Sequence, residues 1–295
     1  REYIKIRNMA AVRDRRIWPG WDDKVLADWN GLMIAALAKA SRAFGQPHWL
    51  ELAGDAFAFV REHMTGEDGR LRHAWRQGTL KHRATLDDYA NMIRAALALH
   101  EATGEDAYLD QARGWTEIVD RHYWDADNGG YFFTADDAAD LILRAKQAND
   151  NAVPAGNATM LANLARLWLL TGDDAFRRRA EAQRAAFAGE LQRNFFPLTS
   201  FLNAADLFER ALQVVIAAAP GEADADALAD AAWSASQPNL VLHYAGGGRP
   251  LPTLHPAYGK GKVAGKAAAY VCRGQTCSLP IADAATLKDA LNEQA

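Results

Sequence analysis

Residues 82–104 read HRATLDDYANMIRAALALHEATG, and two further stretches of the chain align with them without a gap. These are residues 23–45 (DKVLADWNGLMIAALAKASRAFG) and residues 150–172 (DNAVPAGNATMLANLARLWLLTG). In each copy a polar stretch leads into an apolar helix that carries a methionine at the same place and ends at a glycine. A repeat of this kind is typical of stacked helical hairpins.

A second helix is expected after each copy, because an aromatic residue follows the glycine by four positions and an alanine by eight. Gly45, Gly104 and Gly172 occupy the place of a helix C-cap glycine, since glycine adopts a positive φ at little cost. The odd helices are rich in Ala, Leu and Met, and their partners carry more charge, which predicts an inner and an outer ring. Apolar residues recur at the helical period over residues 25–43, 48–64, 85–102, 106–122, 154–170 and 173–192.

The rest of the chain predicts a smaller α/β part. Strand-like pieces are expected in the long loops between hairpins, at residues 70–75 and 130–134. We therefore expect partial α/α toroid hairpins over residues 1–212 and a small α/β element over residues 213–295, packed on the hairpins. The pattern after residue 193 predicts helices over 200–211, 224–234 and 283–293 and strands over 213–218, 240–244 and 267–271.

The composition excludes several classes of function. A net charge of −4 over 295 residues offers no footprint for nucleic acid or anionic lipid. The longest apolar runs are too short to span a bilayer. The two cysteines, Cys272 and Cys277, make no disulfide framework and are expected to pack without redox chemistry, so a cytoplasmic location is the default expectation. The first residue is an arginine, so we expect the sequence to begin inside a longer protein.

Polar residues gather at the N-termini of the odd helices, where the copies differ from one another. If these helices form the inner ring, their N-termini share one rim and offer positive dipole ends to polar ligands. Carboxylates from different repeats around one cavity, with aromatic rings beside them, suit the chemistry of sugars. The clusters contain Trp21, Asp22, Asp23, Asp28, Trp29 and Asn30, then His82, Asp87, Asp88 and Tyr89, then Arg144, Asp150 and Asn157.

A purely structural interpretation of these residues stays open. Thr85 and Asp88 have the spacing of a capping box, and acidic residues in a first helical turn are favoured by the helix dipole whatever the protein does. Asp150 precedes Pro154, a common helix-start residue. Adjacent helical residues point about 100° apart, so at most one of Asp87 and Asp88 faces inward.

Several motifs in fixed order resemble one family. GWDDKVLADWNGLMIAAL, LDDYANMIRAALALHEATG, DNGGYFFT, DNAVPAGN and YVCRGQTCSLPI are similar to the C-terminal region of the thioredoxin-domain-containing proteins typified by spermatogenesis-associated protein 20. The resemblance runs from about Trp18 to the end of the chain. The third motif departs from the family pattern DGAxPSGN at Asn151 and Ala155, so this loop lacks the family's serine.

This resemblance implies an (α/α)6 toroid similar to six-hairpin glycosidases and N-acylglucosamine 2-epimerases. The family carries a thioredoxin-like domain and further toroid helices upstream, and an upstream thioredoxin-like domain is the expected protein partner. Three hairpins and one further helix cannot close a ring of twelve helices. We therefore expect the toroid to be completed by further sequence or by another chain.

Two functions from different classes follow. The first is a carbohydrate-active domain, a glycoside hydrolase, epimerase or isomerase acting on a sugar or sugar derivative without a cofactor or metal. Its expected catalytic residues are Asp23, Asp88 and Asp150, and the substrate-binding residues are Trp21, Asp22, Trp29, Asn30, His82, Asp87, Tyr89, Arg144 and Asn157. The second is a non-catalytic helical scaffold for the thioredoxin-like domain. A redox role for the two cysteines is a third, minor hypothesis.

Overall fold

Three helical hairpins dominate the computed structural model, which describes residues 9–138, 141–246 and 250–293. Each predicted helix is confirmed to within two residues at either end. The hairpins are α2 (Ala27–Ala43) with α3 (Pro47–His63), α4 (Leu86–Thr103) with α5 (Asp106–His122), and α6 (Gly156–Thr171) with α7 (Asp174–Arg193).

The turns inside the hairpins depend on glycine. Gly45, Gly104 and Gly172 have φ values of 62°, 73° and 67°, in the left-handed region that glycine adopts most easily. The predicted C-cap glycines are confirmed at Gly104 and Gly172, whereas the C-cap of α2 is Phe44 and Gly45 follows it directly. At Gly104 and Gly172 the backbone N–H donates to His100 and Trp168 respectively, four residues back, which satisfies one of the last free carbonyls of each inner helix.

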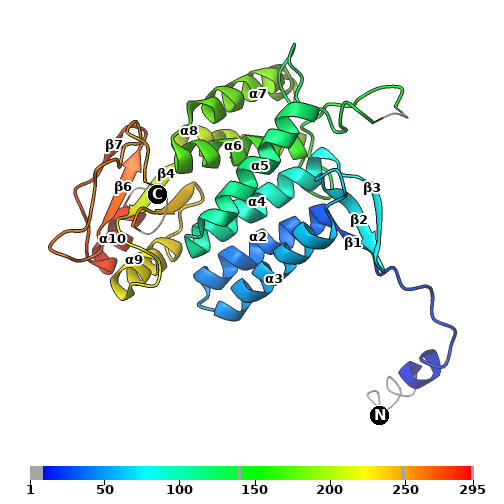
Figure 1. The fold of residues 1–295 in the computed structure, drawn as a ribbon, viewed down its shortest axis with the longest axis horizontal. Coiled ribbons are helices and arrows are strands. Elements are labelled where there is room, and N and C mark those ends of the chain that lie inside the picture. Colours follow the sequence, from blue (N-terminus) through cyan, green and yellow to red (C-terminus); the bar gives the residue numbers. More distant parts are fainter. Residues whose placement is uncertain (1–8, 139–140, 247–249, 294–295) are drawn as a thin grey trace.

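The predicted two-layer arrangement is confirmed: α2, α4, α6 and α8 (Thr199–Arg210) lie side by side as the inner layer, and α3, α5 and α7 cover them outside (Figure 1). Helix α4 lies in the middle and has nearly all its residues buried. Gly31 allows α2 to approach α4 closely, because a Cβ at this position would lie 2.6 Å from the carbonyl carbon of Asn91. A short 3-10 helix, Phe196–Leu198, leads into α8.

A small antiparallel sheet covers the end of the hairpins where the inner helices begin (Figure 1). Its strands are β1 (Val25–Leu26), β2 (Arg72–Arg76) and β3 (Thr79–Arg83), in the order β1-β2-β3 with Val25 opposite Trp75. Strand β2 was expected, and β3 was not. The strand expected at residues 130–134 is absent from the structure, where Tyr131 makes only an isolated bridge with Trp124.

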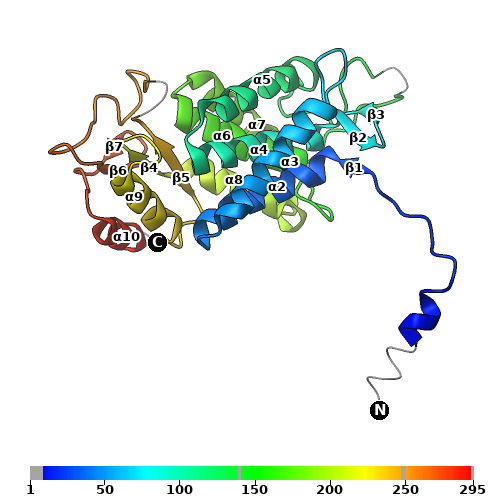
Figure 2. The same ribbon diagram turned by 60° about the horizontal axis from the view of Figure 1, so that its bottom comes forward.

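The C-terminal α/β part lies at the opposite end of the hairpins (Figures 1 and 2). Its sheet has the order β5-β4-β6-β7, with β4 and β5 parallel and the other pairs antiparallel. Apolar side chains between this sheet and its two helices form a hydrophobic cluster apart from that of the hairpins. The elements are β4 (Leu212–Ile216), α9 (Ala223–Trp233), β5 (Leu240–Tyr244), β6 (Ala269–Arg273), β7 (Thr276–Cys277) and α10 (Ala284–Asn292).

Buried polar contacts join the two parts. A carboxylate oxygen of Glu101 on α4 accepts the backbone N–H of Leu242 at 3.2 Å, and the side chain of Gln213 donates to the carbonyl of Leu169 at 2.7 Å. Cys272 and Cys277 face each other across β6 and β7 and are joined by a disulfide, so the expectation of two packing cysteines was wrong. No helix within the described ranges has the length and apolarity that crossing a membrane requires.

Candidate carboxylate site at the inner-helix N-termini

Asp88 is the fully buried centre of the site. Its carboxylate accepts the backbone N–H of Thr85 at 2.7 Å, the bond that residue 88 contributes to the expected capping box of α4, and the Thr85 hydroxyl at 2.9 Å. It also accepts the backbone N–H of Asp28 on α2, at 3.1 Å. A fully buried carboxylate requires such donors, because its charge is otherwise far less stable than in water. Asp88 therefore joins the first helices of two hairpins.

His73 on β2 completes the surroundings of Asp88. Its Nδ1 lies 3.0 Å from both carboxylate oxygens of Asp88. The hydrogen bond to Asp88 raises the pKa of His73, against the opposing effect of burial. The ligand atoms of Asp28, His73 and Asp88 all lie within 4.8 Å of one another. The oxygens of Asp88 are already engaged by hydrogen-bond donors, so this cluster is explained without a metal ion.

Asp28 and Asp87 are the two carboxylates with raised pKa values on either side of Asp88. Burial, followed by the negative charge of Asp88, raises the pKa of Asp87 to about 6. The same two causes in the same order raise the pKa of Asp28. A carboxyl group in a partly buried place beside another carboxylate is harder to ionise, which is the usual condition of a catalytic acid.

Asp87 lines a cavity of about 210 Å³ at the start of α6. It accepts a hydrogen bond from the backbone N–H of Gly156, which lowers its pKa against the larger effect of burial. A Cβ at residue 156 would lie 2.3 Å from a carboxylate oxygen of Asp87, so any other residue there would displace the Asp87 side chain. Asn149, Asn151 and Asn157 also line the cavity. Residues of the second and third repeats thus meet here.

The signal for Asp28 and Asp87 lies in the repeat itself. Asp28 precedes Met33 by five residues and Asp87 precedes Met92 by five, so the two aspartates occupy the same position in two aligned copies. The third copy has Ala155 there. Asp87 was expected to bind substrate, whereas Asp28 was noted only as a rim residue. Their shared position in the aligned repeats is the sequence signal that pairs Asp28 with Asp87.

Asp22 and Asp23 lie outside this group. Asp23 forms an ion pair with Arg76, the last residue of β2, and accepts a hydrogen bond at 2.9 Å from Gln77 in the turn that follows. Asp22 is exposed and pairs with Lys24 at 2.6 Å. The hydrogen bonds from these partners lower the pKa of each aspartate.

Asp150 and Asn157 hold the loop before α6 in place. The two oxygens of Asp150 accept the backbone N–H groups of Ala155 and Ser200, at 3.0 and 2.7 Å, and thereby connect this loop to the start of α8. The side chain of Asn157 is buried and exchanges hydrogen bonds with the backbone of Tyr131 in both directions, at 2.9 Å. Both residues act on the backbone in this structure.

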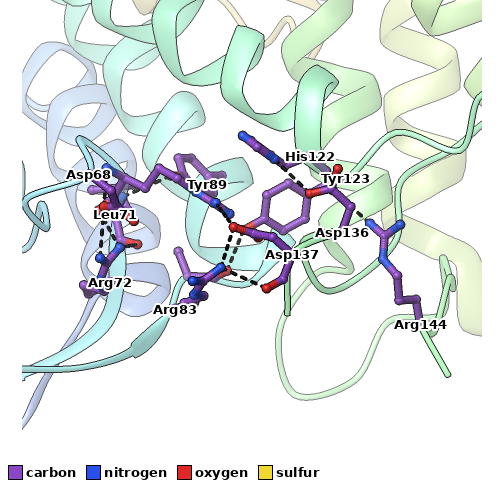
Figure 3. Close-up of polar contacts among 12 residues, drawn as sticks. Asp68, Leu71, Arg72, Arg83, Tyr89, His122, Tyr123, Asp136, Asp137 and Arg144 are labelled. Carbon is purple, nitrogen blue, oxygen red and sulfur yellow. Dashed lines mark hydrogen bonds and ion pairs between the residues drawn. The ribbon is translucent and has the colours of Figure 1, made fainter. Parts of the chain in front are cut away.

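Tyr89 and Arg144 belong to a polar network behind the rim (Figure 3). The buried Tyr89 hydroxyl accepts the backbone N–H of Leu71 at 3.0 Å, and its ring packs edge-on against Tyr123. The Arg144 guanidinium donates to the carbonyl of His122 at 2.9 Å and lies over the ring of Phe132. In Figure 3 these contacts tie the loops between hairpins to the helices.

The remaining predicted binding residues differ in exposure. Trp21 is 84% exposed, in the leading segment that extends away from the hairpins (Figure 1). Trp29 is 61% exposed and lines a shallow apolar groove with Met33 and Val153. The side chain of Asn30 donates to the carbonyl of Leu26 at 2.8 Å, and His82 is exposed on β3 with a φ of 57°. Trp29 is thus the predicted aromatic residue that lies beside Asp28 with an open face.

Residues 7–212 match the model of glycosyl hydrolase family 76, a range that contains all three hairpins and the carboxylate site. The chain belongs to glycosyl hydrolase family 76. This membership makes the hairpin region of the chain a carbohydrate-active type of domain.

Two relatives match nearly the whole of this chain with less than half of their own length. The chain is 32% identical over 304 residues to human spermatogenesis-associated protein 20, covering 97% of this chain and 38% of that protein. It is 26% identical to an uncharacterized Caenorhabditis elegans protein, covering 96% of this chain and 40% of the other. The chain thus spans less than half the length of these relatives.

Among solved structures, a family 76 α-mannanase of Bacteroides thetaiotaomicron resembles the chain with a TM-score of 0.50 at 17% identity. The likeness covers 63% of this chain and 53% of that one. It supports the predicted fold, the helical hairpins of an (α/α)6 toroid with a small C-terminal α/β part.

Proposed function

We propose that the hairpin region acts on a sugar or a sugar derivative at the rim of the inner helices, with Asp87 and Asp28 as its reactive carboxylates. The observation that carries this proposal is the position of Asp87, which lines a cavity formed by two repeats beside the fully buried Asp88. Burial and the charge of Asp88 raise the pKa of Asp87 there to about 6. Cleavage of a glycosidic bond needs one carboxyl group that is protonated near neutral pH and a second that is ionised.

Asp87 has the properties of the acid. Burial keeps a share of its side chain protonated close to neutral pH, and its cavity gives a substrate oxygen access to that proton. Asp28 is the proposed second carboxylate, since it lies on the neighbouring inner helix, where its backbone N–H donates to Asp88. Epimerisation or isomerisation of a sugar would use the same two groups to move a proton.

Asp88 is a positioning residue in this scheme. It has no exposed surface, and its negative charge raises the pKa of both neighbours. The catalytic assignment of Asp23, Asp88 and Asp150 stays a prediction, and the backbone and arginine contacts of these residues favour Asp87 and Asp28 over them. The open ring of Trp29 supports stacking of a sugar face beside Asp28.

A ligand screen followed by kinetics tests the proposal. Binding of neutral mono- and disaccharides, α-linked mannose disaccharides among them, is measured by the thermal shift of the chain, and release of reducing ends is measured for those that bind. We expect Asp87→Asn to lower kcat by about a hundredfold or more, the usual effect of losing a general acid. Because the acid must be protonated, activity is expected to fall as pH rises through about 6.

The matched control is Asp55→Asn, an exposed aspartate on the outer helix α3, for which we expect unchanged kinetics. The proposal fails if Asp87→Asn retains full activity on a sugar that the chain converts, or if no sugar binds. In the second case, capture of a separately expressed thioredoxin-like domain by the chain would favour the scaffold function.

A further inference from the structure

A second cavity lies between the inner helices and is rich in positive charge. It has a volume of about 450 Å³ and is lined by residues of α2, α4, α6 and α8 and by residues 238 and 239. Its positive charges are Lys39 on α2, Arg94 on α4 and Arg166 on α6, one from each of the three repeats. A volume of this size suits a small ligand.

The carboxylates at this cavity are already engaged. Glu101 lies 2.6 Å from an Arg166 nitrogen and also accepts the backbone N–H of Leu242. Asp206 accepts a hydrogen bond from Asn239 at 2.5 Å and lies 3.5 Å from Arg210. Within the described ranges, the side chains of Lys39 and Arg94 make no hydrogen bond or ion pair.

The unpaired cations are unfavourable in the free protein. The positive charge of Arg166, together with burial, lowers the pKa of Lys39 to about 7. Burial and the charge of Arg166 also lower the pKa of Arg94. Like charges that are partly removed from water repel each other more than they do on an open surface. An anion in the cavity would remove this repulsion.

A neutral polar group at the cavity lacks a partner as well. Asn163 is 1% exposed and donates from its amide nitrogen to the carbonyl of Ala90, while its amide oxygen has no hydrogen-bond partner among the described residues. An acceptor left unpaired in this way calls for a donor such as a hydroxyl group.

We propose that this cavity binds an oxyanionic group, a phosphate or a carboxylate, carried by a small hydroxylated molecule, with Lys39, Arg94 and Arg166 as its cationic contacts. Arginine forks bind such oxygens with paired hydrogen bonds, and lysine adds a point charge. The cavity adjoins that of Asp87, since Pro154 lines both. The inference holds whether or not Asp87 and Asp28 are catalytic.

Sulfate binding to the 295-residue chain is the first test, because the charge of sulfate is constant between pH 6 and 8.5. Calorimetry is expected to show an affinity that Lys39→Gln and Arg94→Gln each lower by about tenfold or more, the loss of one charge-assisted hydrogen bond. Lys288→Gln, an exposed lysine of α10, is the matched control and is expected to change nothing.

The melting temperature without sulfate distinguishes an anion-binding role of Lys39 from a structural role. Lys39→Gln is expected to raise the melting temperature at pH 6 without sulfate, since it removes a repelled charge, and to reduce the increase in melting temperature that sulfate produces.

The affinity for sulfate is also expected to depend on pH. It is expected to fall from pH 6 to pH 8.5 as Lys39 loses its proton. The other charged groups that face Lys39 are Arg94 and Glu101 on α4, Arg166 on α6 and Asp206 on α8.

Three further ligands test the hydroxylated carrier: glucose 6-phosphate, glucuronate and uncharged glucose. We expect one of the two anionic sugars to bind at least tenfold more tightly than sulfate, and glucose not to compete with sulfate. Equal affinities for sulfate and for both anionic sugars would contradict the proposal that the anionic group belongs to a hydroxylated molecule. Absence of binding by all the anions, or a lower melting temperature of Lys39→Gln without sulfate, would overturn the anion site.

Discussion

At the scale of single residues, three neighbouring aspartates have three different environments. Asp88 is buried and hydrogen-bonded, Asp87 borders a cavity, and Asp28 begins the neighbouring helix beside them. Their sequence context is similar, since each lies in the first turn of an inner helix. Contacts with residues far away in sequence therefore decide which carboxylate is available for chemistry.

Asp88→Asn is expected to lower the free energy of unfolding by about 2–4 kcal/mol, because it removes the ion pair with His73 and leaves buried N–H donors poorly paired. Denaturant unfolding at pH 6 measures this. Asp22→Asn, which breaks only an exposed pair with Lys24, is the control and is expected to leave the free energy of unfolding nearly unchanged. If both variants changed the free energy of unfolding equally, Asp88 would not stabilise the site through its buried contacts.

Asp87 is expected to make stability depend on pH. Its pKa is higher in the folded state than in the unfolded state, so the folded state binds more protons and stability falls as pH rises from about 4 to about 6. Asp87→Asn removes this loss and is expected to be more stable than the original chain by about 1–3 kcal/mol above pH 7. Unfolding free energies of both proteins at pH 4 and pH 8 give the comparison, and a difference that does not grow with pH would contradict the raised pKa.

At the scale of helices, close packing of α2 on α4 brings Asp28 to Asp88. The approach depends on Gly31, where a Cβ would meet the backbone around Asn91. The sequence predicted both helices and their shared layer correctly, because the apolar period and the glycine ends are local features. The distance between α2 and α4 was not predictable, because it depends on the contact of Gly31 with the backbone of α4, and no local pattern specifies that contact.

Gly31→Ala is expected to destabilise the chain by about 1–3 kcal/mol, since the backbone of α4 must move to make room. Gly114→Ala is the matched control: it lies inside α5 with nothing within 4 Å of an added Cβ and is expected to stabilise by about 0.5–1 kcal/mol. Thermal unfolding of the two variants is expected to shift in opposite directions. A stabilising effect of both would show that α2 and α4 pack less closely.

At the scale of the whole molecule, Glu101 joins the hairpins to the C-terminal α/β part. Its carboxylate pairs with Arg166 at the cavity between the inner helices and also accepts the backbone N–H of Leu242 on β5. Whether residues 1–212 and 213–295 are separate domains stays a proposal, and these buried contacts predict that the two parts unfold together.

Glu101→Gln is expected to lower the free energy of unfolding by about 3–5 kcal/mol, because Arg166 then loses its buried partner beside Lys39 and Arg94. Calorimetry measures this, and sulfate is expected to restore part of the loss. Two separate transitions in the original chain would contradict the joint unfolding of the two parts.

The sequence by itself determined the hairpins, their layers, their glycine turns and, in the C-terminal part, β4, β5, β6, α9 and α10, but not β7. Each of these follows from a local pattern, a period or a capping residue, that short segments express independently of their neighbours. Only the tertiary structure decided that Asp28 meets Asp88 and His73, that Asp87 borders a cavity while Asp150 holds backbone, and that Lys39 and Arg94 share a cavity with Arg166. Burial and charge in these places depend on residues of different helices, strands and loops, and no local pattern records them.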